Sequence, residues 1–176
     1  MKARKSGKLA FCGVLTALAL VLLLFTASPV ATVALAAVAA VCGVPVVVEA
    51  GRRAALLHVL AVAVLALLLV PAVEGKVLYV AFFGWYTVFK AWLEGKSLPR
   101  LGEWGVKLGT FVLAMAGGAL VLWLVLKPTI PYHPALLAGA AVGLCGVFFL
   151  YDWGLTGLVG LYVARVHPVF SRIFRF

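Results

Sequence analysis

Long apolar runs separated by short polar segments dominate the pattern of this chain. The runs fall at about 9–27, 31–48, 54–70, 77–92, 106–126 and 135–164. An α-helix needs about 20 mostly apolar residues to cross roughly 30 Å of hydrocarbon, and shorter runs cross where the bilayer thins. The runs are continuous, unlike the alternating strands of membrane barrels. The pattern therefore predicts an all-α fold, a polytopic membrane helix bundle of about six transmembrane helices that forms a single transmembrane domain over residues 1–176.

The last apolar region is too long for one ordinary span and too short for two, and Asp152 interrupts it. Two interpretations fit this length. Either one helix ends near Tyr151 and an interfacial helix follows, or a single tilted helix projects beyond the membrane.

Composition supports lipid as the solvent for most of the chain. Hydrophobic residues make up 66% of the sequence and charged residues 11%, and the mean hydropathy is +1.20. Soluble domains are about half apolar and a quarter charged. Too few polar groups are present to cover a water-soluble surface of this size.

The basic residues predict the orientation, because Lys and Arg in short loops stay on the cytoplasmic side. With the N-terminus inside, 13 of the 15 basic residues fall in cytoplasmic segments, and only Lys76 and Lys127 fall outside. We therefore expect an N-in/C-in protein of the cytoplasmic (inner) membrane. The net charge of +10 is then explained by anionic lipid, and we expect no nucleic-acid partner.

Asp152 is the acid with the most unusual neighbours, because apolar and aromatic residues flank it on both sides. A carboxylate at a helix centre costs about 2.5 to 3.5 kcal/mol on insertion scales unless it is paired or hydrated. We expect a structural ion pair with a cytoplasmic-side base, for which Arg52, Arg53 and Lys90 are the candidates. A coupling or proton-carrying role is the alternative.

Other side chains are weaker candidates for solute binding. An aromatic cluster in the fourth run is expected to form a packed face of the bundle, and its alternative role is the wall of a ligand pocket with Tyr79 and Trp85 nearer the outside. His133, in an outer loop, is a third candidate. The spacing of four residues also permits Glu49–Arg53 and Lys90–Glu94 pairs along a helix face.

Small residues four apart let membrane helices approach closely. Gly13 and Ala17 form such a pair in the first run. We consider them a docking surface for another membrane subunit, with packing inside the bundle as the alternative.

The basic start at residues 2–5, the Gly13–Ala17 pair and the six-helix layout together resemble the substrate-binding (S) components of energy-coupling factor transporters. The resemblance implies capture of a vitamin or metal ion from outside and docking of the first helix on a transmembrane coupling subunit served by ATPases. The chain is also similar to uncharacterised six-helix membrane proteins of Gram-positive bacteria, through residues 82–86, Lys90, Glu94, Tyr151, Asp152, Leu155, Thr156 and Tyr162. That second similarity supports the topology and implies no activity.

Three classes of function remain: a solute-binding transporter subunit, a structural or assembly protein, and an intramembrane enzyme. The sequence contains no paired aspartates, no His-Glu-x-x-His motif and no phosphate-binding loop. We therefore predict that the chain is not an enzyme and uses no cofactor or metal. The sequence favours the transporter subunit, with the assembly protein second.

Overall fold

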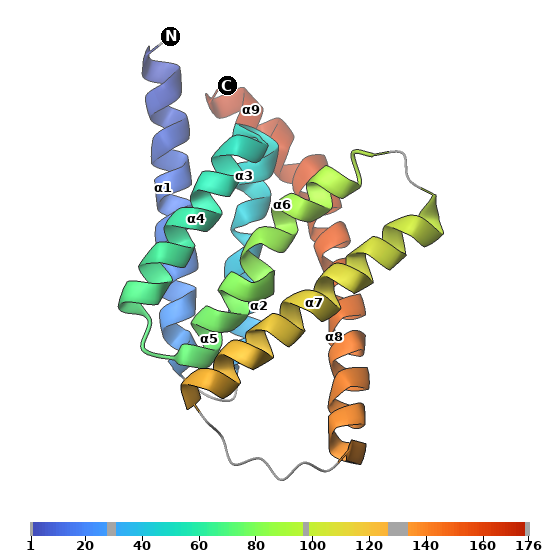
Figure 1. Ribbon diagram of the computed structural model, residues 1–176. Coiled ribbons are helices and arrows are strands. Elements are labelled where there is room, and N and C mark those ends of the chain that lie inside the picture. Colours follow the sequence, from blue (N-terminus) through green and yellow to red (C-terminus); the bar gives the residue numbers. More distant parts are fainter. Residues whose placement is uncertain (1, 28–30, 97–98, 127–133, 175–176) are drawn as a thin grey trace.

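The computed structural model describes residues 2–27, 31–96, 99–126 and 134–174, which are helical apart from short links (Figure 1). The first half contains α1 (Lys2–Leu24), the 3₁₀ turn η1 (Phe25–Ala27), α2 (Thr32–Val41), α3 (Gly43–Ala50) and α4 (Arg52–Leu69). The second half contains α5 (Val73–Leu78), the π-helical η2 (Tyr79–Phe83), α6 (Gly84–Leu93), α7 (Arg100–Leu126), α8 (Pro134–Leu161), the π-helical η3 (Tyr162–Val166) and α9 (His167–Phe174).

Five helical segments of the described chain are long and apolar enough to cross a membrane. They cover Gly7–Ala27, Thr32–Ala50, Arg52–Leu69, Arg100–Val125 and Val142–Phe170. The described residues confirm the all-α class, and the length and hydropathy of these segments fit the membrane character expected from the sequence. The fourth predicted run, now α5–η2–α6, is not among the five. It carries Glu74, Lys76 and Lys90, and many of its side chains are buried against neighbouring helices.

Two of the predicted boundaries differ from the structure. The fifth helix begins at Arg100 rather than near residue 106, so residues expected in a loop form its first turns. The last region stays helical from Pro134 through η3 to Phe174. The helix therefore does not end near Tyr151, and the continuous-helix interpretation is the one that agrees with the structure.

Two glycines permit local structures that a side chain would disfavour. Gly51 adopts φ +86°, a conformation that L side chains rarely occupy, and it separates α3 from α4. At Gly75, an added Cβ would overlap the Thr26 side chain. The absence of a side chain there lets α5 pack directly against η1.

Aromatic side chains of η2 and α6 form the centre of the core. Tyr79, Phe82 and Tyr86 are fully buried, and the Phe82 ring lies 5.0 Å from the ring of Phe111 on α7. Phe111 in turn stacks on Phe148 of α8 with ring centroids 4.7 Å apart. This packing confirms the predicted packed aromatic face, and it brings η2, α7 and α8 together.

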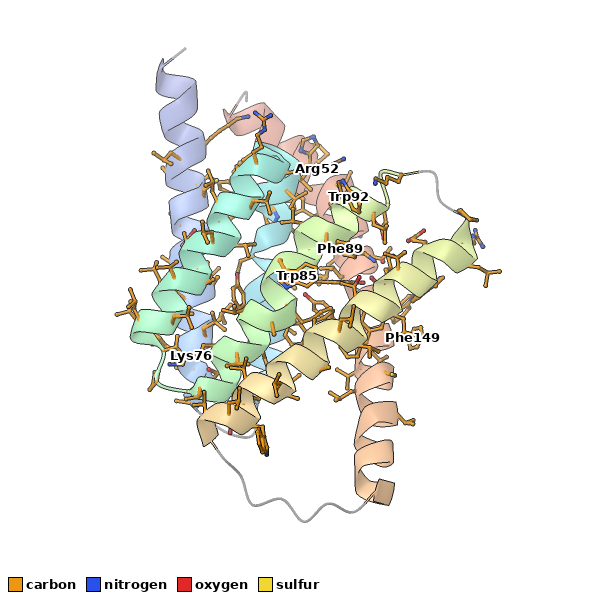
Figure 2. All side chains as sticks on the ribbon, viewed as in Figure 1. Arg52, Lys76, Trp85, Phe89, Trp92 and Phe149 are labelled. Atoms are coloured by element: carbon orange, nitrogen blue, oxygen red, sulfur yellow. The ribbon has the colours of Figure 1, made fainter. Side chains whose placement is uncertain are left out.

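The start of α1 and the last helix, α9, lie at the same end of the bundle (Figure 1). The rings of Phe11 and Phe170 are 4.8 Å apart there. Arg52 lies toward this end, and Lys76 lies toward the opposite end (Figure 2). We call the first the terminal end and the second the distal end.

Candidate functional site

Asp152 lies on α8 where this helix meets α6, and it is 3% exposed. Its Oδ1 accepts a 2.7 Å hydrogen bond from the Tyr86 hydroxyl and a 2.5 Å ion-paired bond from the Lys90 ammonium. The Asp152 backbone carbonyl also accepts the Thr156 hydroxyl at 2.8 Å and Lys90 Nζ at 3.4 Å. Burial of this carboxylate is therefore offset by charge and by hydrogen bonds.

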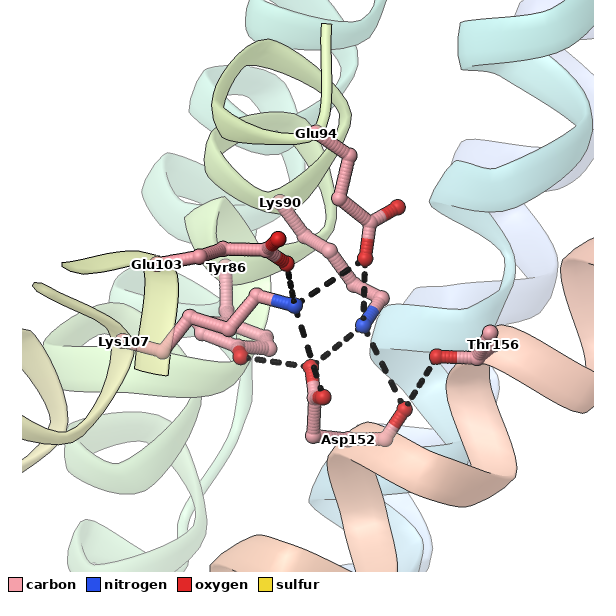
Figure 3. A network of polar contacts seen from close by, with 7 residues as sticks. All are labelled: Tyr86, Lys90, Glu94, Glu103, Lys107, Asp152 and Thr156. Carbon is pink, nitrogen blue, oxygen red and sulfur yellow. Dashed lines mark hydrogen bonds and ion pairs between the residues drawn. The ribbon is translucent and has the colours of Figure 1, made fainter. Parts of the chain in front are cut away.

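A second lysine completes the site from α7 (Figure 3). Lys107 Nζ lies 2.6 Å from Glu103, 3.0 Å from Glu94 and 3.6 Å from Asp152 Oδ2. Glu94 also lies 2.9 Å from Lys90, so it bridges both ammonium groups. We call Lys90, Glu94, Glu103, Lys107 and Asp152 the charge cluster.

The charge cluster has a buried centre and a partly exposed rim. Lys90, Lys107 and Asp152 are each 3% exposed, whereas the side chains of Glu94 and Glu103 are 41% and 27% exposed. Two buried cations thus share one buried anion, and the rim carboxylates supply the remaining negative charge. Because its members come from three helices, the charge cluster ties α6, α7 and α8 together.

The sequence identified only part of this site. Lys90 is the candidate base that contacts Asp152. Arg52 and Arg53 are exposed on the first turn of α4 and lie outside the charge cluster, so the prediction that included them is corrected. Lys107 was missed because the expected start of its helix placed it at a span end.

A second buried carboxylate, Glu49, lies at the terminal end. Its Oε1 contacts His167 Nδ1 at 2.8 Å and accepts the Tyr162 hydroxyl at 3.2 Å, which joins α3 to η3 and α9. Glu49 and Arg53, both among the described residues, do not form the ion pair that their helical spacing permits. Gly51 ends α3 between these two residues, so they do not share one helix. The expected Lys90–Glu94 pair is present.

His58 joins α4 to α1 inside the bundle. The Thr16 hydroxyl donates to the Cys12 carbonyl at 2.8 Å and lies 2.9 Å from His58 Nδ1. If Thr16 gives its only proton to that carbonyl, His58 must donate through Nδ1. Within the described part of the chain, His58 Nε2 and the hydroxyls of Tyr79 and Tyr151 are buried without a hydrogen-bond partner.

The structure describes two of the three sequence candidates for solute binding, Tyr79 and Trp85. Tyr79 is fully buried in the core, and Trp85 uses its indole N–H to bond the Ala81 carbonyl at 2.8 Å. His133 lies outside the described residues. Neither Tyr79 nor Trp85 lines the largest of the pockets described next.

A pocket with a volume of about 510 Å³ lies between α2, η2 and α8. It is lined by Thr32, Val33, Ala34, Ala37, Phe83, Val147, Leu150 and Tyr151. We call it the α2–α8 pocket. It extends from Thr32, the first residue of α2, to Tyr151, whose neighbour Asp152 belongs to the charge cluster. A groove of about 410 Å³ between α4, α5 and α7 is lined by aliphatic residues and glycines.

The predicted docking pair lies on the surface of the bundle. Gly13 and Ala17 are both exposed on α1, and a Cβ added at Gly13 would have no neighbour within 4 Å among the described residues. The alternative that this pair packs inside the bundle is therefore not what the structure shows. Comparison with family models, curated proteins and solved structures gives no match to this chain.

Proposed function

We propose that this protein is a membrane-embedded binding subunit that captures a small, vitamin-like solute for a transporter whose ATPases reside on other chains. The α2–α8 pocket is the observation that carries the proposal. Ligand pockets are typically 300 to 1,000 Å³ and mostly apolar, and the volume of about 510 Å³ with apolar and aromatic lining fits this range.

In the proposed topology, the α2–α8 pocket lies toward the outer face of the membrane. We assign six membrane crossings, of which α5–η2–α6 is the fourth. The protein then lies in the cytoplasmic membrane with both termini in the cytoplasm. The common position of α1's start and α9 supports an even number of crossings (Figure 1). Arg52 and Lys76 at opposite ends agree with the expected partition of basic residues (Figure 2).

The pocket lining favours one class of solute. None of its eight side chains is charged, whereas Phe83 and Tyr151 offer aromatic surface. A bare ion would lose its hydration there without gaining ligands. An uncharged or weakly polar organic molecule is therefore the better occupant than the ion that the family resemblance also allows.

Energy for transport must come from a partner. The exposed Gly13 and Ala17 give α1 a smooth outer face, which is the surface that the resemblance to S components assigns to the coupling subunit. Gly13→Leu and Ala17→Leu should then preserve insertion and monodispersity while abolishing co-purification of that subunit. Recovery of the same partner with both variants would contradict this assignment.

The bound compound can be identified directly from purified protein. Protein from its native membranes is extracted with solvent, and the extract is analysed by mass spectrometry. Val147→Trp should fill the pocket and remove the bound compound. Val142→Trp lies five residues away on the same helix, is 74% exposed and lies outside the pocket, so it should retain the compound. Recovery of phospholipid alone from the parent, or equal recovery from both variants, would contradict the proposal.

A structural or assembly role is the second candidate, and the open faces of α8 favour it. Added Cβ atoms at Gly139, Gly143 and Gly146 would meet no described atom within 4 Å, which leaves this helix open to contact with another chain. An assembly protein would retain its partner in Val147→Trp and would yield no pocket compound, so the extraction experiment separates the two candidates.

A further inference from the structure

We propose that a narrow crevice in the terminal half of the bundle holds water molecules and connects the buried Lys90–Asp152 pair with the aqueous phase. The crevice lies between α3, α6 and α8 and is separate from the α2–α8 pocket. It is lined by Val44, Val47, Val48, Thr87, Lys90, Ala91, Glu94, Leu155 and Val159. This inference does not depend on the identity of the solute.

The polar groups of the crevice follow one face of α6. Glu94 is 41% exposed and marks the end nearest solvent. Lys90, one turn deeper, is 3% exposed and contacts both Glu94 and Asp152. Thr87 lies almost one further turn inward, where its hydroxyl donates to the Ala40 carbonyl at 3.3 Å. Charged and hydrogen-bonding groups therefore extend from the surface to the buried pair.

The volume of the crevice fits water and excludes larger ligands. It measures about 50 Å³, and one buried water needs about 10 to 15 Å³ on this measure. A few molecules can therefore be accommodated. An apolar cavity of this size would stay dry, but Lys90, Glu94 and Thr87 supply the polar partners that a buried water requires.

An unpartnered buried nitrogen among the described residues belongs to His58, which is outside the crevice lining but borders Gly43 together with the lining residue Thr87. A Cβ added to Gly43 would lie 3.9 Å from His58 Cδ2 and 3.8 Å from Thr87 Cγ2, so both side chains border Gly43. His58 Nε2, which is bonded to Cδ2 in the ring, has no hydrogen-bond partner among the described residues. Buried polar atoms without a protein partner are commonly satisfied by water. Water that extends from the crevice past Thr87 would satisfy this nitrogen.

Water in the crevice would change what the Lys90–Asp152 pair can do. A sealed ion pair only fixes helix packing, whereas a hydrated pair exchanges protons with the solvent at the terminal end. The proton would pass between water and the Lys90 ammonium or the Asp152 carboxylate, with no other reactant needed. This gives the charge cluster a route to respond to the aqueous phase.

Hydroxyl-radical footprinting tests the crevice in the unmodified full-length protein. Pulse radiolysis generates radicals from bound water, and these oxidise side chains next to it. Leu155 lines the crevice and is 2% exposed, whereas Leu23, in the core on α1, is 0% exposed and lies outside it. We expect Leu155 to be oxidised several-fold faster than Leu23. Equal, slow oxidation of both leucines would overturn the proposal.

A filled crevice provides the second measurement. Val47→Phe should displace the water and reduce Leu155 oxidation toward the rate of Leu23. Val38→Phe introduces the same bulk on α2 at a position that is 51% exposed and outside the crevice, so it should leave Leu155 oxidation unchanged. If Val47→Phe fails to fold, the oxidation rates of Leu155 and Leu23 in the parent protein still test whether the crevice holds water. Unchanged oxidation of Leu155 in a folded Val47→Phe protein would show that its radicals come from elsewhere and would overturn the proposal.

Discussion

Asp152→Asn is the substitution whose effect the charge cluster predicts most sharply. The change removes the one buried anion between Lys90 and Lys107 in the described cluster but keeps an oxygen that can accept the Tyr86 hydroxyl. Breaking a buried pair by removing one partner costs about 3 to 5 kcal/mol. Glu94 still contacts both lysines, so we expect a loss at the lower end, about 3 kcal/mol of unfolding free energy.

Reversible SDS titration in mixed micelles, followed by tryptophan fluorescence, measures this loss. In a double-mutant cycle, Asp152→Asn and Lys90→Gln should show an interaction energy of about 2 kcal/mol, because the second change removes the charge that the first left unmatched. The same cycle with Arg52→Gln or Arg53→Gln should show none, since both arginines are exposed and outside the cluster. Parent-like stability of Asp152→Asn, or equal coupling to an arginine, would refute the reasoning.

Three further results are expected. Gly75→Ala should lose about 1 to 3 kcal/mol through overpacking against the threonine beside it, whereas Gly117→Ala, with no described atom within 4 Å of its added Cβ, should unfold like the parent. Glu49→Gln should weaken the attachment of α9, seen as faster amide hydrogen exchange in residues 162–174 with unchanged exchange in α4. In a cysteine-free background, Lys76→Cys should react with an impermeant thiol reagent from outside cells and Lys96→Cys should be protected; the reverse pattern would contradict the proposed orientation.

The sequence predicted the helical segments well because their apolar runs are long and their breaks contain glycine, proline or charge. It also predicted that Asp152 pairs with a base, because a charge within an apolar run is conspicuous and costly to leave unpaired. The sequence also contains a signal for Lys107: Glu103 and Lys107 are four apart, as Lys90 and Glu94 are, and they form an i,i+4 pair. That spacing favours a helix starting before Glu103.

Other contacts had no local signal. Tyr86 and Asp152 are 66 residues apart, and Glu49 and His167 are 118 apart, so only the packing of whole helices brings them together. The Glu49–Arg53 expectation failed because helical spacing carries no information once Gly51 adopts a positive φ. The α2–α8 pocket likewise depends on how far α8 stands from α2, which apolar periodicity does not determine.

Binding of a compound in the α2–α8 pocket is tested most directly by thermal unfolding of ligand-stripped protein with and without the solvent extract of native protein. A ligand that binds only the folded state raises the unfolding midpoint. We predict that the extract raises the midpoint of the parent and of Val142→Trp and leaves that of Val147→Trp unchanged. An equal rise in all three proteins, or no rise in the parent, would contradict the proposed function.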